Sequence, residues 1–172
     1  EELNLSTLDT SKVTNMENMF YNCKKIKIVN VSKFNTSKVI NMSMMFDGCE
    51  SAERIDVSGF DTSNVISMDY MFFGCKKITG LDVNKFDTSK VTDMESMFQG
   101  CKNIRNVDVS KFDTSNVSSM RMMFGGCEKV GDIDVSQFDT SKVMDMSYMF
   151  SYCYILTDLD VSNFNTSQVT NM

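Results

Sequence analysis

Six cysteines are the side chains of this sequence with the widest chemical range, because a thiol can form disulfides, bind zinc or act as a nucleophile. They recur every 26 residues, at Cys23, Cys49, Cys75, Cys101, Cys127 and Cys153. An even number of cysteines in an exported chain ordinarily indicates disulfides. Side chains that stack in register point the same way, however, whereas a disulfide needs a Cβ–S–S–Cβ angle of about 90°. The spacing therefore predicts a column of free, buried thiols.

Two columns of acidic and amide side chains recur at the same interval. One consists of Asn4, Asn30, Asp56, Asp82, Asp108, Asp134 and Asp160, and the other of Asp9, Asn35, Asp61, Asp87, Asp113, Asp139 and Asn165. Stacked carboxylates repel one another, and calcium could bridge them through oxygen ligands. Alternatively, each side chain hydrogen-bonds its own backbone in a turn, which survives the exchange of Asp for Asn. We expect no cofactor, with calcium as the one metal that the pattern allows.

A column of lysines lies three residues beyond the second acidic column and could neutralise it. Its members are Lys12, Lys38, Lys90 and Lys142.

The residue combinations that catalysis usually needs are missing. The sequence contains no histidine, so hydrolase arrangements of serine or cysteine lack their usual base. It also contains no glycine-rich phosphate-binding motif. A net charge of −6 argues against binding to nucleic-acid phosphates, and no apolar run approaches the roughly 18 residues of a membrane-spanning helix. We predict a protein that is not an enzyme, does not bind nucleic acid and does not insert into a membrane.

Apolar residues keep the same interval without insertion or deletion. Phenylalanine recurs at Phe20, Phe46, Phe72, Phe98, Phe124 and Phe150, and methionine at Met16, Met42, Met68, Met94, Met120, Met146 and Met172. A fixed period between about 20 and 50 residues is typical of repeat proteins, and 26 residues are too few for a propeller blade of about 40–45. The sequence predicts stacked coils whose shared apolar side is buried only by stacking.

Residues 81–106 illustrate the elements expected in each coil. Leu81 and Val83 alternate with polar residues, which predicts a half-buried strand. The segment Asp87-Thr88-Ser89 favours a turn or a helix cap, because these side chains bond nearby backbone N–H groups. An apolar stripe with steps of three and four residues favours a short helical segment next, with a short strand and a single turn as the alternative. Its members are Val91, Met94, Met97, Phe98 and Cys101.

Glycine recurs near the end of this stripe and predicts a left-handed backbone conformation there. It stands at Gly48, Gly74, Gly100 and Gly126.

The unit Leu-Asp-Val-Ser/Asn-x-Phe-Asp-Thr-Ser-x-Val-x-x-Met-x-x-Met-Phe-x-Gly-Cys resembles the 26-residue repeat of bacterial surface proteins in the BspA-like leucine-rich repeat family. The resemblance covers the whole chain. Departures are Leu8 at a phenylalanine position, Tyr152 at the glycine position and Ala52 at an isoleucine position. It implies a leucine-rich-repeat-like solenoid with a parallel sheet of one short strand per coil, and short helical turns or a second short strand on the opposite side.

The resemblance further implies a cell-surface or extracellular protein used for adhesion. Family members usually carry an export signal and an anchor, and polar caps usually close a solenoid. Residues 1–172 show none of these. We therefore expect a single array of about six and a half coils that is a fragment of a longer one.

Aromatic residues outside the repeating core are the candidate partner-binding residues, since exposed tyrosines often anchor interfaces. They are Tyr148, Tyr152 and Tyr154, together with Tyr70 and Phe73. The alternative is that they pack against neighbouring loops.

Two functions fit these observations. The first is adhesion to host or matrix proteins through the solenoid face, which the uneven tyrosines favour. The second is self-assembly with copies of itself into an extracellular filament or surface coat, which the unbroken register favours. An intracellular scaffold is a third reading, and it would suit reduced thiols.

Overall fold

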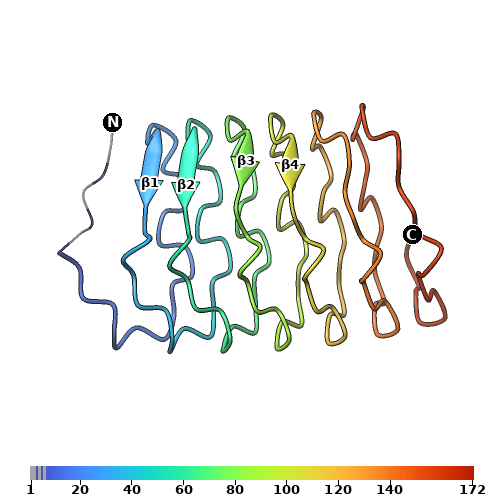
Figure 1. Ribbon diagram of the computed structural model, residues 1–172, viewed down its shortest axis with the longest axis horizontal. Coiled ribbons are helices and arrows are strands. Elements are labelled where there is room, and N and C mark those ends of the chain that lie inside the picture. The colour runs from blue at the N-terminus through green and yellow to red at the C-terminus, as the bar shows by residue number, and fades with distance from the viewer. Residues whose placement is uncertain (1–2, 4, 6) are drawn as a thin grey trace.

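The computed structural model describes residues 3, 5 and 7–172, and these form a solenoid of stacked coils (Figure 1). Successive coils lie side by side from the N-terminus to the C-terminus. Parallel bridges join Asn41 to Ser67 and Ser67 to Asp93, so each coil lies in register with the residues 26 positions later. The expected leucine-rich-repeat-like solenoid is therefore confirmed.

Short parallel strands occupy one side of the solenoid (Figure 1). They are β1 (Ile28–Asn30), β2 (Arg54–Asp56), β3 (Gly80–Leu81) and β4 (Asn106–Val107). Strand β1 pairs with β2 and β3 pairs with β4, in both cases in parallel. A bridge between Asp132 and Asp158 continues the pattern into later coils. The predicted strands exist, and they are only two or three residues long.

The helical segment favoured by the sequence is wrong, and its alternative fits better, because Asp93 forms parallel bridges to Ser67 and Ser119 and turns follow it. Within the described residues the apolar stripe forms consecutive turns, such as those closed by Met97 N–H to Met94 C=O and by Cys101 N–H to Phe98 C=O. The N–H groups between these turn bonds donate to the next coil instead. For example, Ser96 N–H donates to Arg121 C=O at 2.8 Å. Ser96 and Gly100 have φ angles of 54° and 71°, and a left-handed residue every fourth position interrupts a right-handed helix.

The left-handed glycines are confirmed. Their φ angles are 72° at Gly48, 65° at Gly74, 71° at Gly100 and 73° at Gly126. At Gly100 the conformation rather than lack of space favours glycine, because a Cβ there would approach Gly74 Cα no closer than 3.6 Å. The described residues also include no helix long and apolar enough to cross a membrane.

The core between the two sides is a set of side-chain columns. Phe72, Phe98 and Phe124 are fully buried. Their rings stack at centroid distances of 5.8 Å and 5.5 Å, with planes tilted by only 3° and 10°. Methionine, valine and cysteine form parallel buried columns. Identical residues are neighbours because the coil is the same length every time, so each coil buries its apolar side against the next.

Candidate interaction surface

Both acidic columns lie at turns, where each side chain accepts a hydrogen bond from the N–H two residues later. Asp87 Oδ1 accepts from Ser89 N at 3.0 Å and from Ser89 Oγ at 2.6 Å. The hydroxyl bond and then the N–H bond hold the pKa of Asp87 below its ordinary value. Asn35 makes the same contact with Ser37 N at 3.2 Å. Backbone capping therefore accounts for the interchange of Asp and Asn, and Asn4 lies outside the described residues.

The same geometry bears on calcium. Among residues 3, 5 and 7–172, no three acidic or cysteine side chains converge as a metal site would require. Each column instead spaces its carboxylates one coil apart, with one oxygen of each bonded to its own turn.

Two members of the lysine column, Lys90 and Lys142, donate to amides of the preceding coil, and their charges also favour the ionised forms of Asp87 and Asp139. Lys90 Nζ donates to Asn64 Oδ1 at 2.7 Å, and Lys142 Nζ donates to Asn116 Oδ1 at 2.7 Å. Asn116 Nδ2 in turn donates to Ser89 C=O at 2.9 Å. Lysine and asparagine alternate from Lys38 to Lys142, which keeps the ammonium groups two coils apart and relieves their repulsion. Sequence reasoning missed this alternation, although it becomes visible when residues 38, 64, 90, 116 and 142 are compared.

The cysteines are free thiols in the structure, and the four in the central coils are fully buried. Each of these donates a weak S–H hydrogen bond to a phenylalanine carbonyl of the preceding coil. Cys75 Sγ lies 3.3 Å from Phe46 O, and Cys101 Sγ lies 3.1 Å from Phe72 O. The column thus links neighbouring coils through the backbone and forms no disulfide.

Thiol reactivity is expected to follow this burial. Burial raises the pKa of Cys49 to about 12 and that of Cys153 to about 11. Only the thiolate reacts, so a thiol reagent at neutral pH should modify at most the half-buried Cys23 and Cys153 in the native chain, and all six after denaturation. Counting released chromophore before and after denaturant measures this. Fewer than six reactive thiols under denaturing, non-reducing conditions would contradict it.

The same pKa values give alkaline sensitivity. A raised pKa stabilises the fold fully below the unfolded thiol value of about 8.5. That stabilisation disappears as the pH rises toward the folded values of about 11 and 12.

Three candidate partner-binding tyrosines project into solvent from one coil. Tyr148, Tyr152 and Tyr154 are 61%, 68% and 69% exposed. The rings of Tyr152 and Tyr154 form an edge-to-face pair with centroids 6.1 Å apart. Tyr148 and Tyr152 both have left-handed φ angles, of 59° and 58°. We call these three residues the tyrosine patch.

The other two candidates behave differently. Tyr70 and Phe73 are half-buried and pack against each other, with ring centroids 5.6 Å apart. The Tyr70 hydroxyl donates to Glu95 Oε1 of the next coil at 2.5 Å. These two side chains therefore pack within the solenoid, as the alternative interpretation holds, and lie in a coil distant from the tyrosine patch.

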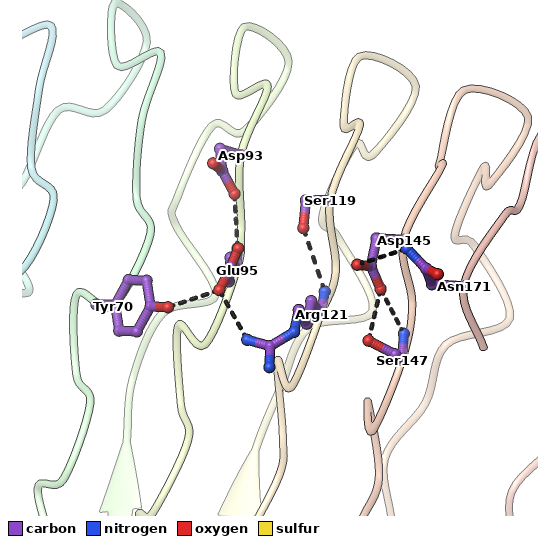
Figure 2. A network of polar contacts seen from close by, with 8 residues as sticks. All are labelled: Tyr70, Asp93, Glu95, Ser119, Arg121, Asp145, Ser147 and Asn171. Carbon is purple, nitrogen blue, oxygen red and sulfur yellow. Dashed lines mark hydrogen bonds and ion pairs between the residues drawn. The ribbon is translucent and has the colours of Figure 1, made fainter.

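A polar network surrounds Tyr70 and crosses three coils (Figure 2). Glu95 Oε1 accepts from Tyr70 and also from Arg121 Nη1 at 3.1 Å. Ser96, next to Glu95, is fully buried, and its hydroxyl has no hydrogen-bond partner among the described residues. Sequence reasoning missed this network. The signal was a charged or polar residue recurring between two buried methionines.

The strand side is grooved and acidic. One open groove is lined by residues 54–58 and 80–82 with Asn106 and Asp108. A second is lined by residues 132–136 and 157–160, which include Asp132, Asp134, Asp158 and Asp160. The strand side therefore offers open hollows in which apolar residues such as Ile55 and Leu81 lie beside carboxylates.

Coils of 26 residues that are joined in parallel by short strands and isolated bridges define a leucine-rich-repeat-like solenoid. The chain belongs to the family described as "Mycoplasma protein of unknown function, DUF285", whose model matches residues 1–81 and 67–172. Among solved structures, the leucine-rich repeat protein of T. pallidum is similar over 91% of this chain and 77% of its own, with 17% identity and a TM-score of 0.42. No curated protein sequence matches.

Proposed function

We propose that this chain is a non-enzymatic cell-surface protein that binds other proteins through its solenoid surface, with the tyrosine patch as the contact region. Repeat arrays commonly present extended binding surfaces, because coils add area without adding separate cores. Family membership supports a protein-binding repeat. The proposal concerns adhesion to host or matrix proteins.

The tyrosine patch carries this proposal. A tyrosine in a left-handed conformation costs of order 1–3 kcal/mol unless surrounding contacts compensate. Tyr152 occupies the position that glycine holds in four other coils, and it takes the same left-handed conformation with a φ angle of 58°. A residue whose type conflicts with its backbone conformation, without stabilising the fold, is typical of functional positions. Tyrosine is also enriched in the binding regions of interfaces.

The repeat itself supplies variants that should leave the fold intact. Tyr152→Gly restores the residue of the other coils, Tyr154→Lys places the residue found at Lys102, and Tyr148→Ser places that found at Ser96. We expect the triple variant to melt no lower than the parent and to lose at least tenfold in binding to decellularised matrix from cultured animal cells.

A matched control changes a tyrosine outside the patch. Tyr21→Asn alters a residue that is 50% exposed at the other end of the described coils. Binding should survive this change. Equal binding by parent and triple variant, or equal loss with Tyr21→Asn, would refute the role of the tyrosine patch.

Self-assembly is the second candidate, and the continuous backbone ladder favours it. Bridges run from Asn15 to Asn171 through every intervening coil without a change of register. Electron microscopy of the native protein distinguishes the two candidates: filaments with a regular axial repeat support a structural role, and separate rods at high concentration support the binding protein.

A further inference from the structure

Asp93 and Asp145 occupy equivalent positions two coils apart, yet their surroundings differ (Figure 2). Both belong to the column of bridged residues that also contains Asn15, Asn41 and Asn171. Each accepts a hydrogen bond from the N–H two residues later, at 2.8 Å from both Glu95 and Ser147. The backbone role is thus the same, and any difference between them comes from the side chains nearby.

The negative charge of Asp145 is stabilised by several hydrogen bonds. Its Oδ1 also accepts from Ser147 Oγ at 2.6 Å, and its Oδ2 accepts from Asn171 Nδ2 at 3.3 Å. Burial raises the pKa of Asp145, but the bonds from Ser147 and Asn171, with the nearby Arg121, outweigh it and leave the pKa below its ordinary value.

Asp93 has no such compensation. Its single hydrogen bond comes from Glu95 N, and its own coil places the Glu95 carboxylate beside it. The preceding coil contributes the Asp69 carboxylate and the Tyr70 hydroxyl. The following coil contributes Arg121, which pairs with Glu95 at 3.1 Å. Burial first, and then the charges of Asp69 and Glu95, raise the pKa of Asp93 despite the backbone bond.

We propose that Asp93 is an acid-responsive site of the array. At neutral pH the charge on its carboxylate is unfavourable, first because the side chain is half-buried and then because it repels Asp69 of the preceding coil and Glu95 of its own. This weakens the packing between coil 55–80 and coil 81–106. Protonation removes the repulsion and tightens the same contact. An asparagine would perform the backbone role at every pH, as Asn41 does with Ser43 N at 2.9 Å, so the carboxylate serves the response to acid rather than the fold.

The sign of the effect is opposite at the two aspartates. A group with a raised folded pKa contributes stability at low pH that is lost as the pH rises through that pKa. A group with a lowered folded pKa contributes stability at higher pH that is lost as the pH falls. Acidification therefore strengthens the fold at Asp93 and weakens it at Asp145.

The test compares Asp93→Asn with Asp145→Asn in the full chain. Asp93→Asn should raise the melting temperature at pH 7 by about 2–4 °C, and the gain should shrink as the pH falls because the parent side chain becomes protonated. Asp145→Asn should lower it at pH 7 by a similar amount. Asparagine at Asn15 and Asn171 of the same column shows that both variants suit the coil.

A second readout reports the site directly. In a carboxyl-carbon NMR titration of the native chain, Asp93 should titrate above Asp145. Exchange of the Met68 and Tyr70 N–H groups, which donate to Asp93 C=O and Glu95 C=O across this contact, should slow on acidification after correction for intrinsic rates. Equal destabilisation by both variants at pH 7, or titration of Asp93 at or below the ordinary aspartate value, would overturn the proposal.

Discussion

Phe98→Ala is expected to lower the free energy of unfolding by about 3–5 kcal/mol, the usual cost of removing a buried phenylalanine. The Phe98 side chain is fully buried, and its ring stacks on Phe72 and Phe124 at centroid distances of 5.8 Å and 5.5 Å. Two neighbours lose a stacking partner, and the rigid coils on either side limit collapse into the cavity. Small domains are stable by only about 5–15 kcal/mol, so this change consumes much of the total.

Because Phe98 lies in the middle of the array, its replacement should also change the shape of the unfolding transition. Stability in a repeat array is carried by contacts between adjacent coils, so a defect in the middle separates the array into two weaker parts. Denaturant unfolding followed by circular dichroism should then broaden or show two transitions. Phe73→Ala is the matched control, because Phe73 is half-buried and packs mainly on Tyr70. A loss of about 1 kcal/mol is expected there, and equal losses would refute a central role for the phenylalanine column.

Thr36→Val is the second large effect, although the two side chains have nearly the same shape. Thr36 is 1% exposed. Its Oγ1 donates to Asp61 C=O at 2.8 Å and accepts from Asp61 N at 2.8 Å, so one hydroxyl satisfies both backbone groups of a residue in the next coil. Valine leaves both without a partner. Each orphaned group costs about 1–3 kcal/mol, and calorimetric melting should show the combined loss.

Thr92→Val provides the comparison for this second variant. Thr92 is exposed, and its Oγ1 lies 3.4 Å from Ile66 C=O, at the limit of a hydrogen bond. Water can replace that contact, so a change within about 0.5 kcal/mol is expected. If Thr36→Val proves as mild as Thr92→Val, the hydrogen bonds between the Thr36 hydroxyl and Asp61 do not hold the two coils together.

Much of the fold could be predicted from the period alone. Stacking at a fixed interval makes columns of identical residues, and those columns predict the buried phenylalanines and free thiols. Gly100 also signalled its left-handed conformation, because glycine is the residue that adopts it without strain.

The helical segment could not be excluded from sequence, for a physical reason. Steps of three and four residues bury one stripe equally well on a helix and on a chain of turns closed by bonds from residue i+3 to residue i. The two differ in where the other N–H groups bond. Here Phe98 N–H donates to Met123 C=O, in the next coil, at 2.9 Å.

Thr88 illustrates the same limit. Its neighbours Asp87 and Ser89 bond locally, as the turn prediction expects. The Thr88 hydroxyl instead donates to Asp113 C=O at 2.9 Å in the following coil. The polar network of Tyr70, Glu95 and Arg121 was hidden for the same reason, because its contacts join coils and depend on the direction in which each side chain leans.

The backbone ladder has a consequence for how such chains can evolve. Met94 N–H bonds to Ser119 C=O and Met68 N–H bonds to Asp93 C=O, so successive junctions are built from interchangeable parts. A gene that gains or loses one whole repeat, by recombination between its similar copies, therefore encodes a protein in which all neighbouring coils can still form these hydrogen bonds. The number of coils can therefore vary, and a local feature such as the tyrosine patch keeps its structure while its position along the solenoid changes.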